Sequence, residues 1–463
     1  MENPPSTTTT ATKSLGKGLK TRHLTMMGLG SSIGAGLFLG TGVGIQAAGP
    51  AVILGYIFAG IIVVLFMEML GEMAAARPTS GSFSVYAEQA FGHWAGFSSG
   101  WLYWFMLTMV MGAEMTGAAA IMGEWFGVAP WIPALISVAI FAVINLAHVK
   151  GFGEFEFWFA LIKVAVIILF LIVGVLLVFG LLPGTEYVGM RNILGNGFMP
   201  NGFAGVATGL LAVAFAFGGV EIITIAAAES EDPASSISTA VRSVIWRISL
   251  FYLGSVLVII ALLPFESITG ASNAAESPFT IILGLANIPY VVGFMEATIV
   301  LSLLSAFNAQ IYGTSRLIFS LAERGNAPRI LGVISKQGVP MNAVILSMFF
   351  AFGSVGLQFW NPPGLLTFLL NAVGGCLIVL WVMIAASWMK LHPELVRNNE
   401  ITKVRMLGHP WSAIICLAML ATLVGLMLID ESARGQIWSV AIIFALTVLA
   451  SFITKKSSAS KGL

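Results

Sequence analysis

Long apolar stretches separated by short polar segments occupy almost the whole chain between residues 24 and 454. A helix needs about 20 apolar residues to cross the hydrocarbon core of a bilayer. Twelve stretches satisfy this requirement: residues 24–48, 51–76, 94–123, 130–149, 152–181, 203–228, 237–264, 287–323, 340–360, 363–388, 410–429 and 435–454. The pattern predicts an all-α membrane protein with twelve transmembrane helices. The eighth stretch is too long for one crossing, so we expect it to continue as a cytoplasmic helix.

The first apolar stretch is interrupted by four glycines within nine residues, from Gly28 to Gly36. Each glycine in a helix interior costs about 1 kcal/mol relative to alanine. Unpaired backbone groups at membrane depth are tolerated only where they line a cavity or are buried in protein. A helix broken here would present N–H groups at the positive dipole end of its second half, an arrangement that binds carboxylates. The alternative is that the glycines only allow two helices to pack closely.

A second interruption, Ala214–Glu221, lies in the sixth apolar stretch and contains a glycine pair and an acidic residue. Two interrupted helices in corresponding positions of two halves point to the binding site of a transporter. The first five and the next five predicted helices each begin with an interrupted helix. Because five is odd, the second unit enters the membrane from the opposite side. We therefore predict a five-plus-five inverted repeat with broken helices 1 and 6, followed by two additional C-terminal helices.

The distribution of basic residues predicts the orientation of the chain. If both ends are cytoplasmic, every Lys and Arg except Lys163, Arg191 and Arg434 falls in a cytoplasmic segment or helix end, as the positive-inside rule requires. Short helices are also predicted in two connections, at residues 84–91 and 273–286. The expected organisation is a cytoplasmic N-terminal tail (1–21), a first repeat (22–181), a second repeat (203–388), helices 11 and 12 (410–454) and a cytoplasmic tail (455–463).

The composition agrees with a membrane protein and excludes several other classes. Of 463 residues, 58% are hydrophobic and 9% are charged, whereas a soluble protein carries about 25% charged residues. The net charge of +1 gives no indication of a nucleic-acid partner. The five histidines and two cysteines show no metal-binding spacing, so we expect no metal and no cofactor. Neither the continuous polar stripe of a channel nor the nucleophile–base spacing of an enzyme is present.

Three ionisable residues lie inside predicted membrane helices: Glu114, Lys163 and Glu221. Ionisable groups are costly in hydrocarbon, so each is a functional candidate. Burial disfavours the charged form, which makes Lys163 and Glu114 candidates for proton coupling and Glu221 a candidate for organising the site. The alternative is that they form static ion pairs. Glu68 and Glu72, near the end of the second helix, are predicted to be hydrated.

Uncharged side chains near the interruptions are further candidates. Phe215 and Phe217 flank the second interruption, where one of them would close over a bound substrate; the alternative is ordinary packing. Asn308 and Gln310 lie in the eighth predicted helix. They could hydrogen-bond either a ligand or another helix.

A set of motifs spread over residues 15–455 resembles the amino acid–polyamine–organocation superfamily. Gly34-Ala35-Gly36-Leu37-Phe38 is similar to its G-[SA]-G-[VIL]-F signature. Other motifs are similar to its bacterial amino acid transporter family: Gly71-Glu-Met-Ala74, Pro78-x-x-Gly81-Ser-Phe83, Ala214-Phe-x-Phe-Gly-Gly-x-Glu221, Ala226-Ala-Ala-Glu229, Ser315-Arg316 and Gly325-Asn-Ala-Pro328. Residues 22–28 and 151–163 look most like the aromatic amino acid permeases of that family.

This resemblance implies the inverted-repeat fold and the uptake of an amino acid with protons. The backbone N–H groups of Ala35 and Gly36 would bind the substrate carboxylate, and carbonyl groups near Phe215 and Gly218 would accept the ammonium group. Phe215 matches the aromatic gate. Lys163 matches the lysine of proton-coupled relatives. The chain departs from the pattern at Ala35, where several relatives have serine, so one hydroxyl contact is absent.

The sequence therefore predicts a secondary active transporter of the bacterial inner (plasma) membrane that imports amino acids by proton symport. The expected substrates are Phe, Tyr and Trp, and the other expected partners are protons and the lipid bilayer; the oligomeric state is not predicted. The alternatives are another substrate (4-aminobutyrate, proline, histidine or a basic amino acid), an amino acid exchanger, or a membrane sensor. The candidate binding residues are Ser31, Ser32, Gly34, Ala35, Gly36, Phe215, Phe217, Gly218, Glu221 and Asn308.

Overall fold

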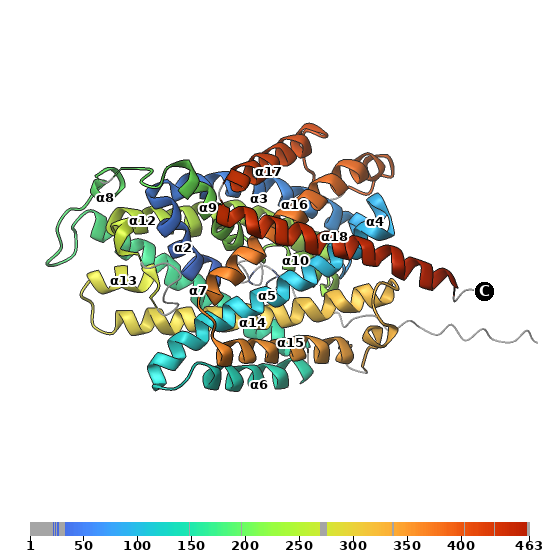
Figure 1. Ribbon diagram of the computed structural model, residues 1–463, viewed down its shortest axis with the longest axis horizontal. Coiled ribbons are helices and arrows are strands. Elements are labelled where there is room, and N and C mark those ends of the chain that lie inside the picture. Colours follow the sequence, from blue (N-terminus) through green and yellow to red (C-terminus); the bar gives the residue numbers. More distant parts are fainter. Residues whose placement is uncertain are drawn as a thin grey trace, which may run out of the picture.

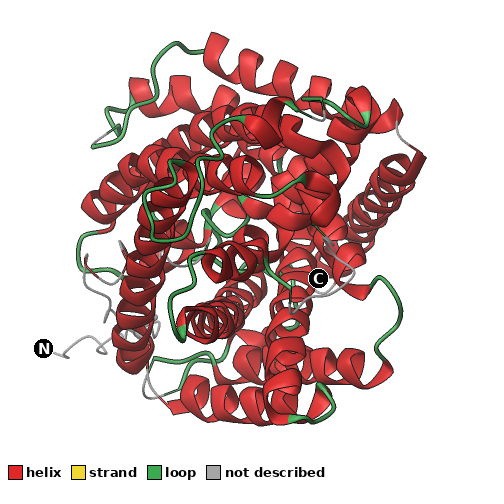
Figure 2. Ribbon diagram, turned by 90° about the vertical axis from the view of Figure 1, so that its left-hand side faces the viewer, coloured by secondary structure: helices red, strands yellow, loops and turns green. Residues whose placement is uncertain are grey.

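A computed structural model of the protein describes residues 22, 24, 26, 33–147, 149–195, 197–268, 276–335, 338–401, 403–429 and 431–460. All regular elements in these ranges are helical, and they form one bundle (Figures 1 and 2). The helices α6, α14 and α15 pack side by side along one edge of the bundle (Figure 1). The α-helices are α2 (Thr41–Ala48), α3 (Val52–Ala76), α4 (Phe83–Phe91), α5 (His93–Phe126), α6 (Trp131–Ala147), α7 (Val149–Val178), α8 (Arg191–Leu194), α9 (Gly202–Ala216), α10 (Ile222–Ala226), α11 (Pro233–Trp246), α12 (Gly254–Leu262), α13 (Pro278–Leu285), α14 (Val291–Glu323), α15 (Met341–Trp360), α16 (Leu365–Arg397), α17 (Trp411–Ile429) and α18 (Glu431–Ser460).

Several shorter helical turns join these elements. Two are wide π-helical turns, η1 (Gly36–Gly40) before α2 and η4 (Arg247–Leu253) between α11 and α12. The others are the 3₁₀ turns η2 (Gly49–Ala51), η3 (Ala227–Glu229), η5 (Phe265–Ser267) and η6 (Arg329–Gly332). The predicted stretch 237–264 is therefore one helical rod with a π turn at its middle.

Within the described ranges, nine helical segments are long and apolar enough to cross a membrane. The segment Gly36–Ala76 combines parts of the first two predicted helices, because the 3₁₀ turn η2 follows α2 directly and leads into α3. Gly49, the first residue of η2, leaves the helical conformation with a φ of 65°. Two shorter apolar helices, Trp131–Leu146 and Gly202–Ala216, lie in the fourth and sixth predicted stretches. The prediction of an all-helical membrane protein is confirmed.

Both short helices predicted in the connections are present. Helix α4 follows Ser82, which adopts a positive φ of 45°. Helix α13 begins at Pro278, and the side chain of Ser277 caps it by accepting a hydrogen bond from the Phe279 N–H at 3.4 Å, as expected for this pair of residues at a helix start. The Ser277 hydroxyl also donates to the Phe38 carbonyl at 2.7 Å, which fastens α13 to η1.

The described residues of both glycine-rich interruptions include non-helical backbone. Ile33 and Gly34 form a bend, and a helical conformation begins at Ala35; residues 27–32 lie outside the described ranges. In the second interruption, α9 ends at Ala216, residues 217–221 form turns, and α10 begins at Ile222. Gly219 in this turn has a φ of +93°, a conformation that glycine adopts without strain. The predicted break in the sixth helix is confirmed.

The glycines also allow close packing between the segments that follow and precede these breaks. A Cβ atom at Gly36 would lie 2.7 Å from the Cα atom of Ala216, and one at Gly205 would lie 2.4 Å from the Ala47 carbonyl oxygen. The element η1 and helix α2 therefore pack against α9 at backbone contact. Helix breaking and close packing are both consequences of the same glycine-rich sequence.

The end of α3 differs from the sequence prediction. Glu68 is half-buried, but Glu72 is completely buried and is not hydrated. Its carboxylate accepts hydrogen bonds from the Trp388 Nε1–H at 2.8 Å, the Met406 N–H at 2.7 Å and the His392 Nδ1–H at 2.6 Å. Helix α16 and the segment after it fold over this carboxylate and supply three donors in place of water.

Candidate functional site

A small cavity separates the two interruptions. It is lined by Gly34 and Gly36 from the first interruption, Val110 and Glu114 from α5, Phe215, Ala216 and Gly218 from the second interruption, and Gln310 from α14. Its volume of about 10 Å³ corresponds to roughly one water molecule. In this conformation η1 and α9 are too close together to admit an amino acid.

The N–H group of Ala35 has an acceptor within the chain. The Glu114 carboxylate Oε2 accepts a hydrogen bond from this N–H at 2.9 Å, and the Glu114 side chain is only 3% exposed. The other Glu114 oxygen, Oε1, would lie 2.4 Å from a Cβ atom at Gly34. The absence of a side chain at Gly34 is therefore what allows a carboxylate to reach the start of the helix.

Phe215 and Gly218 line the cavity from the second interruption. The Phe215 carbonyl accepts a hydrogen bond from the Gly218 N–H at 2.9 Å, which forms part of the turn after α9. The Phe215 ring lies against the backbone of η1, since its Cδ1 atom would be 3.2 Å from a Cβ atom at Gly36. Phe215 thus covers the cavity in this conformation.

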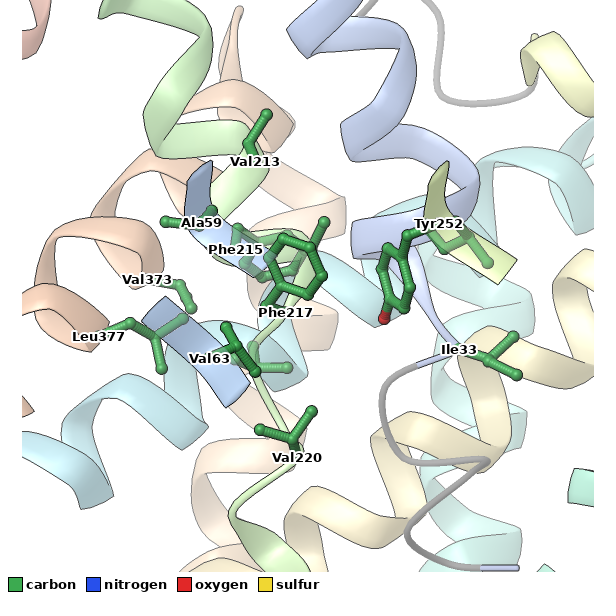
Figure 3. Packing of buried hydrophobic residues seen from close by; sticks show 14 of the residues in the cluster. Ile33, Ala59, Val63, Val213, Phe215, Phe217, Val220, Tyr252, Val373 and Leu377 are labelled. Carbon is green, nitrogen blue, oxygen red and sulfur yellow. The ribbon is translucent and has the colours of Figure 1, made fainter. Parts of the chain in front are cut away.

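Phe217, Glu221 and Asn308 do not line the cavity. The Phe217 ring packs against Tyr252, with ring centroids 4.8 Å apart, and against Tyr56 at 5.8 Å; Figure 3 shows Phe217 beside Tyr252. The Glu221 Oε1 accepts a hydrogen bond from the Gly219 N–H at 3.3 Å, within the same turn. The Asn308 Oδ1 accepts one from Asn145 Nδ2 at 2.6 Å. Ser31 and Ser32 lie outside the described residues.

Lys163 is buried on α7 together with an acidic residue that the sequence analysis did not single out. The Lys163 Nζ lies 4.0 Å from Glu156 Oε1, and both side chains are completely buried. Both Glu156 oxygens also accept from the Ser305 hydroxyl, at 2.8 and 2.9 Å. The sequence could have shown that Glu156 lies near Lys163, because residues seven positions apart in a helix lie on the same face.

Two other residues line the cavity: Val110, which the sequence analysis did not single out, and Gln310, which it named as a possible ligand contact. Val110 lies four positions before Glu114 on α5, which places both on one face. Gln310 is 2% exposed, and its Oε1 has no hydrogen-bond partner among the described residues. A buried acceptor without a donor, on a residue that lines the cavity, is suited to bind a ligand.

Two larger hollows in the described structure are almost entirely apolar. One has a volume of about 290 Å³ and lies between α3 and η4. The other, of about 240 Å³, lies between α16, α17 and α18. Neither is lined by a charged residue, so neither is suited to hold a zwitterion.

The sequence profile of the family described as "Amino acid permease" matches residues 23–455. The chain belongs to the amino acid permease family. The superfamily resemblance inferred from the motifs is therefore confirmed, and the permease is a multi-pass membrane protein. Its family and its relatives are transporters, in agreement with the prediction that it is not an enzyme.

Named relatives cover the permease nearly end to end. "Aromatic amino acid transport protein AroP" from Corynebacterium glutamicum is 70% identical over 449 residues, which are 97% of each chain. "Gamma-aminobutyric acid permease" from Bacillus subtilis is 41% identical over 450 residues, which are 96% of this chain and 95% of that relative. "Aromatic amino acid transport protein AroP" from Escherichia coli is 37% identical over 428 residues, which are 92% of each chain.

Proposed function

We propose that this permease imports aromatic amino acids together with protons across the bacterial inner membrane. The observation that carries the substrate assignment is the 70% identity to a protein named as an aromatic amino acid transporter, over 97% of both chains. The expected substrates are phenylalanine, tyrosine and tryptophan. The named relatives compared above come from bacteria, which supports the bacterial plasma membrane as the location.

The proposed substrate site lies where the two interruptions meet. Ala35 and Gly36 would present backbone N–H groups to the substrate carboxylate at the positive end of the first helix after its break. Carbonyl groups near Phe215 and Gly218 would accept the ammonium group, and the Phe215 ring would close over the substrate. Because the cavity holds only about 10 Å³, substrate binding requires η1 and α9 to move apart, as a cycle of alternating access does.

The proposed membrane topology has twelve crossings and both termini in the cytoplasm. Residues 22–181 and 203–388 would form two inverted repeats, with α17 and α18 outside them. The support for this arrangement is that each proposed repeat begins with an interrupted helix and that the basic residues gather at one set of helix ends. The tails 1–21 and 455–463 then lie in the cytoplasm.

Proton coupling would involve Lys163 and Glu114. Both are buried, and each lies near a second ionisable group or the helix break: Lys163 beside Glu156, and Glu114 at the Ala35 N–H. Loss or gain of one proton changes the charge balance of such a buried cluster, which gives the proton gradient a means of shifting the equilibrium between conformations.

A second candidate function is the transport of 4-aminobutyrate by the same fold. It is favoured by the 41% identity to a protein named as a permease for that compound. Both substrates are zwitterions, so the backbone groups at the two interruptions would suit either. Proline, histidine or basic amino acids, and amino acid exchange, remain alternative activities of the same site.

Competition in reconstituted vesicles tests these assignments. Labelled phenylalanine is taken up in the presence of each unlabelled amino acid, with and without an imposed inward proton gradient. We expect tryptophan and tyrosine to compete, 4-aminobutyrate and proline not to compete, and uptake to fall when the gradient is collapsed. Competition by 4-aminobutyrate or proline but not by tryptophan would overturn the aromatic assignment. Uptake that is unchanged without the gradient would indicate exchange.

A further inference from the structure

The chain's own Glu114 occupies the position proposed for the substrate carboxylate. The first N–H groups of a helix have no partner within that helix. Here the Leu37 and Phe38 N–H groups both donate to the Gly34 carbonyl, at 3.2 and 3.1 Å. The Ala35 N–H instead donates to Glu114 Oε2 at 2.9 Å. A carboxylate is thus already bound at the start of the helix that follows the break.

The surroundings of Glu114 are shaped for a carboxylate at this point. Any side chain at Gly34 would displace it, because a Cβ atom there would lie 2.4 Å from Glu114 Oε1. Gln310 lines the same cavity, and its Oε1 is an acceptor with no donor among the described residues. An ammonium group would supply that donor. The cavity therefore combines a filled carboxylate position with an unfilled position for a cationic group.

A substrate carboxylate and the charged Glu114 side chain cannot share this place. Both need the Ala35 N–H, the cavity offers about 10 Å³ of free space, and two carboxylates at one site repel each other strongly in a buried environment. A proton on Glu114 removes the repulsion and weakens its hold on the N–H, because hydrogen bonds to an ionised acceptor are the stronger ones.

We propose that Glu114 is a tethered competitor of the substrate carboxylate for the Ala35 N–H, and that the substrate is admitted when Glu114 takes up a proton and leaves. This inference rests on the proposed function and gives it a mechanism. The proton adds to a Glu114 oxygen, no covalent bond in the substrate changes, and the substrate carboxylate replaces Glu114 as the acceptor. Each bound amino acid therefore brings one proton into the site.

The charged groups that act on Glu114 lie on α7. Lys163 is the charged neighbour of Glu114, and Glu156 in turn lies 4.0 Å from Lys163. The cavity residues from the first interruption, α9 and α14 are uncharged, and residues 27–32 carry no ionisable side chain. A proton taken up on substrate binding therefore has three candidate positions, Glu114, Glu156 and Lys163, which single substitutions separate.

The test measures binding rather than transport. Purified permease in detergent is titrated with the amino acid that competes best in the vesicle assay, at several pH values, and proton uptake is followed in a weakly buffered solution with an indicator dye. For the wild type we expect about one proton taken up per bound substrate, and an affinity that falls by up to tenfold per pH unit as the pH rises, because the bound form holds one more proton.

The decisive variant is Glu114→Gln, which keeps the shape of the side chain and removes its charge. We expect it to bind substrate without pH dependence and without proton uptake. Glu124→Gln, an exposed carboxylate on the same helix, is the matched control and should behave as the wild type. Glu156→Gln should keep the proton uptake of the wild type. Folding of each variant is checked by its melting temperature and its elution as a single species.

Three results would overturn the proposal. The first is a Glu114→Gln variant that keeps the pH slope and the proton uptake. The second is a folded variant that has lost binding at every pH, which would mean that Glu114 binds the ammonium group. The third is an unchanged proton uptake when the ligand is phenethylamine, which has no carboxylate. In contrast, a wild type that binds no amino acid would refute the proposed function itself.

Discussion

The backbones of Gly36 and Ala216 are in direct contact: a Cβ atom at position 36 would lie 2.7 Å from the Cα atom of Ala216. The obstacle is main chain on the opposing helix, which cannot rotate away. We expect Gly36→Ala to lower the free energy of unfolding by about 1–3 kcal/mol, the usual cost of overpacking, and to reduce uptake severely. Thermal unfolding and vesicle uptake measure the two effects.

Gly40 provides the matched control for this substitution. It lies in the same π turn, but a Cβ atom there would be 3.6 Å from its nearest neighbours, an ordinary contact distance. Gly40→Ala should therefore leave the melting temperature close to that of the wild type. Equal effects of the two substitutions would mean that glycine is needed for its conformation alone and not for the contact with α9.

The two phenylalanines of the second interruption should differ in the effect of their removal. Phe215 faces the cavity, whereas Phe217 packs between Tyr56 and Tyr252. We expect Phe215→Ala to weaken substrate retention and Phe217→Ala mainly to lower stability, by about 3–5 kcal/mol as for other buried Phe→Ala changes. Substrate dissociation rates and melting temperatures separate these outcomes. A Phe217→Ala variant with normal stability and faster substrate release would reverse the roles.

Lys163→Gln should reduce accumulation more than binding. The substitution removes the cation beside Glu156, at 4.0 Å, and leaves the cavity lining unchanged. We expect substrate affinity within a few-fold of wild type but uptake that no longer rises with an inward proton gradient. The double variant Lys163→Gln, Glu156→Gln removes both charges and serves as a control for the cost of an unpaired buried carboxylate. Normal gradient-driven uptake by both variants would exclude a coupling role for Lys163.

Glu72→Gln should loosen the segment after α16. A glutamine has only one acceptor oxygen, so at least one of the three donors around Glu72 would lose its partner. An unsatisfied buried donor costs about 1–3 kcal/mol. We expect a lower melting temperature and faster proteolysis between residues 398 and 410. The half-buried Glu68 on the same helix is the control, and Glu68→Gln should change neither property.

The contact between Arg77 and Glu400 predicts a pH dependence of stability. Arg77 Nε and Nη2 donate to Glu400 at 2.5 and 2.9 Å, and these bonds lower the pKa of the Glu400 carboxyl from 4.5 to about 2. A lowered pKa in the folded state means that the stabilisation is present above about pH 4.5 and is lost as the pH falls towards 2. The contact joins the end of α3 to the segment after α16, as Glu72 does.

Glu400→Gln isolates this contribution. The difference in melting temperature between the wild type and the variant should be constant from pH 7 to about pH 5 and should shrink at lower pH, because the wild-type carboxyl becomes protonated. The magnitude is modest, since both side chains are partly exposed, at 25% and 29%, and solvent weakens such pairs. A difference that grows on acidification would contradict the assignment.

The local sequence predicted most of the elements and both interruptions that line the cavity. Apolar length located the membrane helices, and the glycine pair before Glu221 located the second break, because both signals act over a few residues. The pair Ser277-Pro278 likewise gave the start of α13. In contrast, the burial of Glu72 depends on Trp388, His392 and Met406, more than 300 positions away in the chain, which no local pattern reports.

The same limit applies within the candidate site. Glu114 was identified as an ionisable residue in a membrane helix, but its bond to Ala35 requires α5 to face the first break. Glu156 was missed although its spacing from Lys163 on α7 was visible in the sequence. For Gly36 the sequence left helix breaking and close packing as alternatives, and it could not name Ala216 as the packing partner that the structure shows. The bond between Glu114 and Ala35 and the contact between Gly36 and Ala216 depend on how separate helices pack together, which a local sequence pattern does not report.

The small volume of the chamber has a practical consequence for the search for inhibitors. A screen against this conformation would select compounds that bind in the apolar hollow between α3 and η4. The volume of this hollow is about 290 Å³, whereas the cavity between the two breaks has a volume of about 10 Å³. Because the lining of this hollow is apolar and lies apart from the cavity between the two breaks, such compounds would compete with lipid acyl chains and not with the amino acid substrate. Molecules meant to block the transport path must instead be selected against a form in which Gly36 and Ala216 have separated.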